Sequence, residues 1–284
     1  MPFGGTATKS ALVKGLVVLE TLVDAGGPMT LSRLVSRCGL PKSTTYRVAV
    51  ALVERGWLRE TPKGYWLGYR FLQSIGVLEG TLDARHEAAE AMRALRDELD
   101  ETVHLAVLDH EYRVVYLDKL VPANQAVGLM QSRIGATAPA YCTGIGKAML
   151  AHLPQDELDG FFTNARLMPF TNRTIVSRVE LEAELERIRL RGYSTDIREH
   201  EDSVSCIAAA VFDRNGRPIA GLSVAGPYER MQVLLEDEAV GRRVHELALS
   251  VSERFGWRDA VSANRTASAI DQNNGGENGK RIFS

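Results

Sequence analysis

A run of six polar and charged side chains near the N-terminus has the groups needed to contact nucleic acid. The run Lys-Ser-Thr-Thr-Tyr-Arg occupies residues 42–47, directly after Pro41. Lys and Arg reach phosphate oxygens or the O6 and N7 acceptors of guanine, and hydroxyl groups suit either partner. The residues predicted to contact DNA, including one from a nearby turn, are Lys42, Ser43, Thr44, Thr45, Tyr46, Arg47 and Lys63.

The elements around this run follow the order of a winged helix-turn-helix. Residues 10–25 repeat apolar side chains at helical spacing and end at Gly-Gly-Pro. Thr30 is placed to cap a short second helix, and Pro41 opens a third, where its fixed φ costs little. In such motifs the start of the second helix of the helix-turn-helix pair meets base edges in the major groove. The polar run therefore lies where a recognition helix would begin.

The third helix and the segment after it complete the motif. Its core face is expected, from helical spacing, at Tyr46, Val50, Val53 and Trp57. Two short runs rich in Trp, Tyr and Leu then flank Thr-Pro-Lys-Gly at residues 61–64, a turn signal that predicts a β-hairpin, the wing.

The charge distribution separates this part of the chain from the rest. Residues 9–70 contain ten Lys or Arg and four Asp or Glu, whereas the rest of the chain holds 24 basic and 32 acidic residues. A basic module joined to an acidic body favours a polyanion-binding end, although uneven surface charge explains the balance as well. A three-helix protein-interaction domain is the alternative interpretation. Taken with the hydroxyl-rich helix start and the wing, the balance favours DNA binding.

Three reactive sites suggested by the second half of the chain fail on spacing. The segment GIGKA resembles a phosphate-binding loop, but Tyr141 and Ala148 stand where that motif needs Gly and Ser or Thr. Asp196, His200 and Cys206 could form a nucleophilic triad, yet a surface histidine in the acidic run REHED is the simpler interpretation. Cys142, His200 and Cys206 follow no usual zinc spacing. We predict no catalytic residue, no metal and no cofactor.

The body of the chain changes from helical to strand periodicity near residue 102. We expect strands at 102–109, 113–120, 125–131, 194–197, 206–213 and 217–226. Helices are expected at 82–99, from Gly144, across VELEAELERIRLRG, and from 229 to 255. This is an α+β body with a mixed sheet of about six strands. A helical connector with Phe71, Leu72, Ile75 and Leu78 joins it to the wing, and residues 260–284 are predicted to be disordered.

Composition excludes other classes of protein. No stretch approaches 18 uncharged apolar residues, so a transmembrane helix is not expected. Three cysteines cannot form a framework of pairs, which fits a reducing cytoplasm.

Three segments resemble the IclR family of bacterial transcriptional regulators. They are PKSTTYRVAVALVERGWL, IGATAPAYCTGIGKAMLA and RGYSTDIREHEDSVSCIAAAVFDRNGRPIAGLSVAGP. The resemblance covers about residues 9–257 and implies a winged helix-turn-helix at 9–68, a linker helix at 69–81 and a GAF-like effector-binding domain at 82–259. It also implies a homodimer or a dimer of dimers on operator DNA, acting as a repressor of a catabolic operon.

The same resemblance implies a pocket for a small carboxylic acid such as a keto acid or sugar acid. Carried over position by position, the effector-binding residues are Val127, Met130, Gly144, Ile145, Asp196, Cys206 and Ser223. A further position, often Ser in the family, is Ala225 here. The start of a helix after Gly144 independently offers N–H groups and a positive dipole end for a carboxylate. The alternative function is an enzyme acting on a small acid through Cys206 and Asp196, with an accessory DNA-binding domain.

Overall fold

The computed structural model describes residues 10–79, 84–123 and 132–258. The chain divides into two compact units, Met1–Asp83 and Ala84–Ser284. The strand expected at 125–131, with Val127 and Met130, and the tail expected at 260–284 lie outside the described residues.

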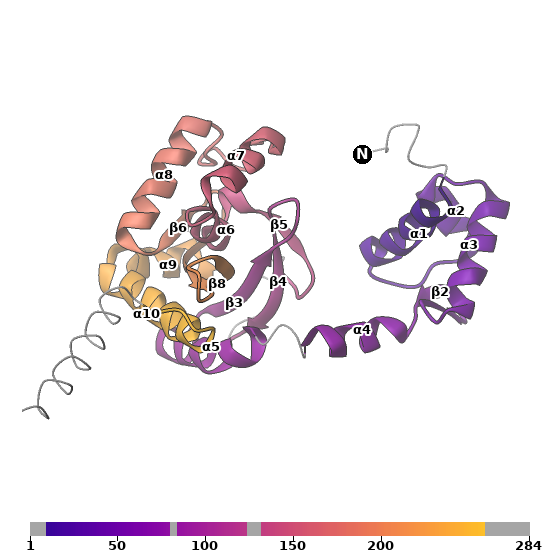
Figure 1. Ribbon diagram of the computed structural model, residues 1–284, viewed down its shortest axis with the longest axis horizontal. Coiled ribbons are helices and arrows are strands. Elements are labelled where there is room, and N and C mark those ends of the chain that lie inside the picture. Colours follow the sequence, from indigo (N-terminus) through magenta and orange to yellow (C-terminus); the bar gives the residue numbers. More distant parts are fainter. Residues whose placement is uncertain (1–9, 80–83, 124–131, 259–284) are drawn as a thin grey trace, which may run out of the picture. The chain divides into compact units, whose positions relative to one another are not determined.

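The first unit is a winged helix-turn-helix, as predicted (Figure 1). Its elements are α1 (Ala11–Ala25), α2 (Leu31–Cys38), α3 (Lys42–Glu54), β1 (Leu58–Thr61), β2 (Gly64–Leu67) and α4 (Arg70–Glu79). Local signals set the ends of the helices. The side chain of Thr30 accepts the Arg33 N–H at 3.4 Å, and Gly26 and Gly39 end α1 and α2 in the left-handed region.

The face that α3 buries is rotated by one residue from the predicted face. Thr45 and Ala49 are fully buried, whereas Tyr46, expected in the core, is 50% exposed. Apolar and small side chains lie on two adjacent stripes of this helix, so periodicity alone does not choose between them. A similar choice arises in α1, where Val18 and Leu22 are buried and Leu12 is 72% exposed.

The second unit is built on one six-stranded sheet. Its strands are β3 (Thr102–Leu108), β4 (Arg113–Leu120), β5 (Thr137–Pro139), β6 (Ser194–Ile197), β7 (Val204–Phe212) and β8 (Pro218–Pro227). The order across the sheet is β5-β4-β3-β8-β7-β6, and every pair is antiparallel. Five of the six expected strands are therefore confirmed, but the sheet is antiparallel rather than mixed. The three-residue β5 was not predicted.

Helices cover both faces of this sheet (Figure 1). They are α5 (Ala84–Leu99), α6 (Gly144–Leu150), α7 (Gln155–Asn164), α8 (Arg178–Arg191), α9 (Tyr228–Glu236) and α10 (Glu238–Arg254). The single helix expected at 229–255 is two helices. Asp237 adopts an extended conformation between them, and its Oδ1 accepts the Ala239 N–H at 2.8 Å as the N-cap of α10.

Strand alternation divides the packing between two cores. Leu105, Ile207 and Leu222 pack with α5 and α10 on one face of the sheet. The next residue along β3 and β7, Ala106 and Ala208, packs with α6 and α8 on the other. The period of two thus assigns His104, Cys206 and Ser223 to the α6 side.

The backbone of Gly64, in the wing hairpin, lies too close to the backbone of Met29 for a side chain to fit between them. Its φ is +111°, and a Cβ there would lie 2.1 Å from the Met29 carbonyl oxygen. Gly64→Ala is therefore expected to destabilise this unit by more than about 1 kcal/mol. Hydrogen exchange of the α1–α3 amides in the full chain measures the change.

Gly15 provides the matched control for that substitution. A Cβ at this position in α1 meets no heavy atom within 4 Å. Gly15→Ala should stabilise the unit by up to about 1 kcal/mol through helix propensity. Equal protection in the two variants would contradict the proposed role of Gly64.

Candidate functional site

The first candidate site is the exposed side of α3 together with the wing turn. Lys42, Ser43, Tyr46 and Arg47 are exposed, and Thr44 is partly so. Lys63, also exposed, lies in the turn between β1 and β2. Cationic and hydroxyl groups thus share one surface, as contact with a polyanion requires.

Thr45 does not belong to this surface, contrary to the prediction. Its side chain is fully buried, and its Oγ1 donates to the carbonyl oxygen of Pro41 at 3.2 Å. The same oxygen lies 3.4 Å from the Leu40 carbonyl oxygen. Thr45 therefore holds the turn before α3 in place and has no group available for DNA.

The second candidate site is a small pocket on the α6 side of the sheet. Its cavity volume is about 40 Å³, which is room for a few water-sized groups. Strands β3, β4, β6, β7 and β8 supply most of the wall, and the start of α6 supplies part of the rest. The lining residues are His104, Tyr116, Ser132, Thr143, Ile145, Asp196, His200, Glu201, Val204, Cys206, Ser223 and Ala225.

Four of the seven predicted effector-binding residues line this pocket together. They are Ile145, Asp196, Cys206 and Ser223. Gly144 lies directly behind them, because a Cβ at this position would be 2.5 Å from the Cys206 Sγ. A side chain at 144 would therefore collide with the thiol. Val127 and Met130, as noted, are not described.

Strand register explains why residues distant in sequence meet here. Asp196 pairs with Cys206, and Cys206 pairs with Ala225. On the other side of β8, Ser223 pairs with His104. Because directly paired residues of antiparallel strands project from the same face, these pairs form two adjacent polar rows.

Sequence reasoning missed several lining residues. His104 and Tyr116 lie in strands predicted correctly, but their pocket-facing position follows only from the register of β3 with β8 and of β4 with β3. His200, taken for a surface histidine, lines the same pocket as Cys206. Its ring centroid lies 5.1 Å from that of Phe170, with the ring planes tilted by 60°, and Phe170 comes from a loop whose sequence carried no signal.

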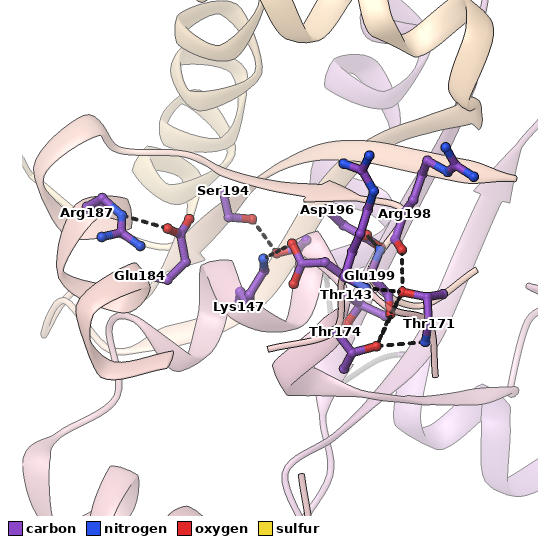
Figure 2. Close-up of polar contacts among 12 residues, drawn as sticks. Thr143, Lys147, Thr171, Thr174, Glu184, Arg187, Ser194, Asp196, Arg198 and Glu199 are labelled. Carbon is purple, nitrogen blue, oxygen red and sulfur yellow. Dashed lines mark hydrogen bonds and ion pairs between the residues drawn. The ribbon is translucent and has the colours of Figure 1, made fainter. Parts of the chain in front are cut away.

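A buried ion pair lies behind the pocket (Figure 2). The Lys147 Nζ of α6 donates to the Glu199 Oε1 at 2.5 Å, and both residues are buried. Asp196 Oδ1 accepts the Glu199 N–H at 2.7 Å. Thr174 Oγ1 donates to the Glu199 carbonyl oxygen at 2.6 Å, and Thr171 Oγ1 to that of Arg198 at 2.7 Å. These bonds fasten the loop after β6.

Burial controls the protonation states in the pocket. Desolvation, followed by the nearby Glu199 carboxylate, raises the pKa of Asp196 to about 7. Burial likewise raises the pKa of the Glu201 carboxyl. Burial and the neighbouring Asp196 raise the pKa of the Cys206 thiol well above its usual range. The thiol therefore keeps its proton and is a poor nucleophile.

The described residues show neither a metal site nor a membrane segment. Within residues 10–79, 84–123 and 132–258, no three His, Cys, Asp or Glu side chains are grouped as metal ligands. In the same part of the chain, no helix is both long and apolar enough to cross a bilayer.

A winged helix-turn-helix followed by a separate unit with an enclosed polar pocket defines a class of protein, the DNA-binding transcriptional regulators. The family model of the IclR helix-turn-helix domain matches residues 11–62. The model of the bacterial transcriptional regulator IclR C-terminal domain matches residues 78–253. The chain belongs to the IclR family of bacterial transcriptional regulators, as its sequence motifs predicted.

Known relatives agree with this assignment. The chain is 32% identical over 238 residues to the transcriptional repressor IclR of Escherichia coli, covering 80% of this chain and 83% of that one. It is 31% identical over 236 residues to the acetate operon repressor of Salmonella typhimurium, with the same coverage of 80% and 83%.

A solved relative extends the comparison to structure. An IclR homologue from Microbacterium hydrocarbonoxydans, crystallised with 4-hydroxybenzoate, superimposes with a TM-score of 0.75 at 25% identity. The match covers 87% of this chain and 99% of the homologue.

The raised pKa of Asp196 predicts a pH-dependent stability. The folded chain holds a proton on this carboxyl between its ordinary pKa of 3.8 and its folded pKa of about 7, where the unfolded chain releases it. The contribution of Asp196 to the free energy of unfolding therefore falls as the pH rises through that window. Asp196→Asn keeps the Oδ1 acceptor. The free energy of unfolding of this variant, minus that of the wild type, should be about 1–3 kcal/mol larger at pH 8 than at pH 5.

Denaturant unfolding at the two pH values measures this difference. Asp213→Asn is the matched control. Desolvation raises the pKa of that carboxyl, but the hydrogen bonds from Asn215 and Arg217 and the Arg217 charge together outweigh it, so the pKa is lowered. Asp213 is ionised at both pH values in folded and unfolded chains, so its variant should show no such difference. If the difference in unfolding free energy between Asp196→Asn and the wild type were also the same at both pH values, the raised pKa of Asp196 would be ruled out.

Proposed function

We propose that this regulator is a cytoplasmic repressor of a catabolic operon whose affinity for its operator is set by a small carboxylic acid. The observation that carries the proposal is the pairing of an exposed cationic helix in one unit with an enclosed polar pocket in the other. The repressor names of the E. coli and Salmonella relatives support repression. The 4-hydroxybenzoate bound to the Microbacterium homologue supports an acid as effector.

The operator contacts proposed for the first unit are the exposed residues of α3 and the wing. They are Lys42, Ser43, Thr44, Tyr46, Arg47 and Lys63. Arg47 is the strongest candidate for base readout, because a guanidinium donates two parallel bonds to a guanine edge.

Arg47→Ala is expected to weaken binding of the full-length protein to DNA from its own promoter region. Loss of one bidentate base contact costs about 1–3 kcal/mol. Fluorescence anisotropy at one fixed salt concentration measures the affinity. Arg55→Ala is the control, since Arg55 is an exposed arginine at the opposite end of the same helix. Equal affinities of both variants, with unchanged circular dichroism, would remove Arg47 from the interface.

The effector's carboxylate is proposed to sit at the start of α6. The Thr143 side chain does not cap this helix, because its Oγ1 donates instead to the Pro139 carbonyl oxygen at 2.8 Å. The N–H group of Ile145, which lines the pocket in the first turn of α6, is therefore proposed as a donor to the ligand. Asp196 and Ser223 then face the hydroxyl or oxo groups of the acid.

The protonation of the pocket makes room for an anion. Ionised Asp196 and Glu201 would repel a carboxylate, but burial raises the pKa of both groups. Asp196, which holds its proton below about pH 7, then donates a hydrogen bond instead of repelling the ligand. The aliphatic side chains that line the pocket are those of Ile145, Val204 and Ala225, so the apolar surface offered to the ligand is small. This favours a small oxygenated acid over a large apolar one.

Ser223→Ala is expected to lower the affinity for the best acid of a panel by about 1 kcal/mol. The panel contains keto acids, sugar acids and 4-hydroxybenzoate, and isothermal titration calorimetry measures binding. Ala225→Ser adds a hydroxyl to the same wall and serves as the reciprocal variant, with an equal or higher affinity. The pocket is misplaced if neither substitution changes the affinity of an acid that binds.

The acid must also change operator affinity. A coupling of about 1–3 kcal/mol requires that the acid bind the DNA-competent and incompetent states with different affinities. We propose that α4 and α5, which lie between the wing and the sheet in the chain, transmit the difference. An acid that binds while operator affinity stays constant would disprove the switch.

We also propose a homodimer or a dimer of dimers. One winged helix reads too few base pairs for a genome-scale search, and two copies double the site. Leu12 and Leu16 of α1 are 72% and 47% exposed, and Leu72 of α4 is 64% exposed, so apolar surface is available for pairing. Sedimentation at micromolar concentration should give at least a dimer, and Leu12→Lys with Leu16→Lys should weaken it. A monomer both on and off DNA would contradict the proposal.

The enzymatic alternative has little chemical support. It needs a reactive thiolate at Cys206, and burial holds the pKa of that thiol far above its usual range. A turnover assay on the same acids tests it directly.

A further inference from the structure

A chain of three polar side chains closes the β3–β4 side of the pocket. His104 on β3 pairs in register with Lys119 on β4. The His104 Nε2 lies 2.8 Å from the Ser132 Oγ. Lys119 Nζ lies 3.0 Å from the same Ser132 Oγ and 2.8 Å from the Ser132 carbonyl oxygen. His104 is 3% exposed, and both it and Ser132 line the pocket.

Counting protons along this chain assigns the direction of each hydrogen bond. An ammonium group only donates, so Lys119 donates to the Ser132 Oγ. The serine hydroxyl has one proton of its own. Among the contacts of the described residues, the acceptor within its reach is the His104 Nε2. Ser132 therefore donates to Nε2, and a neutral imidazole that accepts at Nε2 has its proton on Nδ1.

The surroundings keep the ring neutral. Burial, together with the positive charge of Lys119, lowers the pKa of His104 to about 3. The Tyr116 ring lies 5.1 Å from the His104 ring, and burial raises the pKa of its hydroxyl well above the usual range. Across the pocket are the Asp196 and Glu201 carboxyls and the His200 ring. His104 and Tyr116 thus present neutral rings to the pocket, and the cation of this side, Lys119, is close enough to Glu201 for the two charges to interact.

We infer that His104 is a specificity-determining contact that donates its Nδ1–H to an acceptor oxygen of the effector, with Ser132 and Lys119 as positioning residues. The inference rests on the proposed effector function and favours acids that carry an acceptor oxygen at this place, as oxo acids do, over amino acids. A carbonyl oxygen accepts such a bond. An ammonium group in the same place cannot, because it has only protons to offer. Pyruvate and L-alanine are the matched probes, since they differ at this one position.

The tautomer of His104 is measurable without any ligand. Long-range ¹H–¹⁵N NMR of the full-length protein with ¹⁵N-labelled histidine distinguishes the Nδ1–H from the Nε2–H form. We expect His104, assigned by its absence in His104→Asn, to be neutral at pH 7 with its proton on Nδ1. Ser132→Ala should remove this preference, and Lys119→Met should raise the titration midpoint of the ring. An Nε2–H form in the wild-type chain overturns the inference.

Calorimetry with pyruvate and L-alanine tests the ligand contact. Wild-type protein should bind pyruvate more tightly than L-alanine. His104→Leu removes the donor and should weaken pyruvate binding about five- to tenfold. His104→Asn, whose amide nitrogen offers a donor near the Nδ1 position, should keep the affinity within about threefold. Equal pyruvate affinities of the wild type and His104→Leu overturn the contact, and no pyruvate binding overturns the oxo-acid assignment.

The failure of this inference and the failure of the proposed function give different results. If 4-hydroxybenzoate or gluconate binds and Ser223→Ala weakens it while pyruvate does not bind, the effector pocket stands and the oxo-acid assignment is wrong. If no acid in the panel binds, the proposed effector function fails as well.

Discussion

The buried ion pair between Lys147 and Glu199 is the interaction on which the pocket depends. All seven residues of α6 are buried, and Lys147 is among the most deeply buried side chains of the described chain. Removing two charges from water costs several kcal/mol each, which the 2.5 Å contact and its surrounding hydrogen bonds must offset. If one partner is lost, the other charge is left buried and unpaired, so α6 and the loop after β6 stay together.

This pairing also decides the charge of the pocket. Because Lys147 is committed to Glu199 at hydrogen-bond distance, it only partly offsets the effects of burial and of Glu199 on Asp196, and the pKa of Asp196 remains raised. A pocket with two formal carboxylates then holds less negative charge than its composition indicates. On the opposite wall the His104 ring is neutral, since burial and the Lys119 charge lower its pKa. The result is a site where hydrogen-bond direction, rather than net charge, selects the ligand.

The sequence predicted those features that local signals encode. Helix α2 and the start of α3 were placed within a residue because Thr30, Gly39 and Pro41 act on their own neighbours. The break at Asp237 was missed because one capping side chain interrupts a continuous helical pattern. The buried face of α3, with Thr45 inside, depended on tertiary packing.

The pocket residues also fall into two groups, those found from local sequence motifs and those whose position depends on pairing between distant segments. Ile145, Asp196, Cys206 and Ser223 were found through motifs that resemble the IclR family. His104 was not, because its position beside Ser223 follows from strand pairing between distant segments. Lys147 and Glu199 carried no local sign of their partnership, since a charged residue in a helix is usually exposed.

The two sides of the pocket differ in their freedom to move. On the α6 side, backbones approach too closely for any side chain. An added Cβ would lie 2.5 Å from Cys206 Sγ at Gly144, 2.4 Å from Ala140 at Gly146, and 2.6 Å from Ile145 at Gly221. Close-packed contacts of this kind resist displacement, so we expect the carboxylate seat to stay fixed in every state.

The β3–β4 side is the more adjustable wall and the one connected to the first unit by the chain. The pairing of β3 with β4 has an irregularity in register between Leu105 and Ala106. Ser132 is held to these strands by its hydrogen bonds with His104 and Lys119. A ligand that accepts from His104 adds a bond to β3, which follows α5 directly and packs against it through Leu95 and Leu105. An effector can shift a conformational equilibrium only through contacts that differ between the two states. The physical candidates for such contacts are therefore on β3 and β4, while the fixed seat at α6 supplies affinity common to both states.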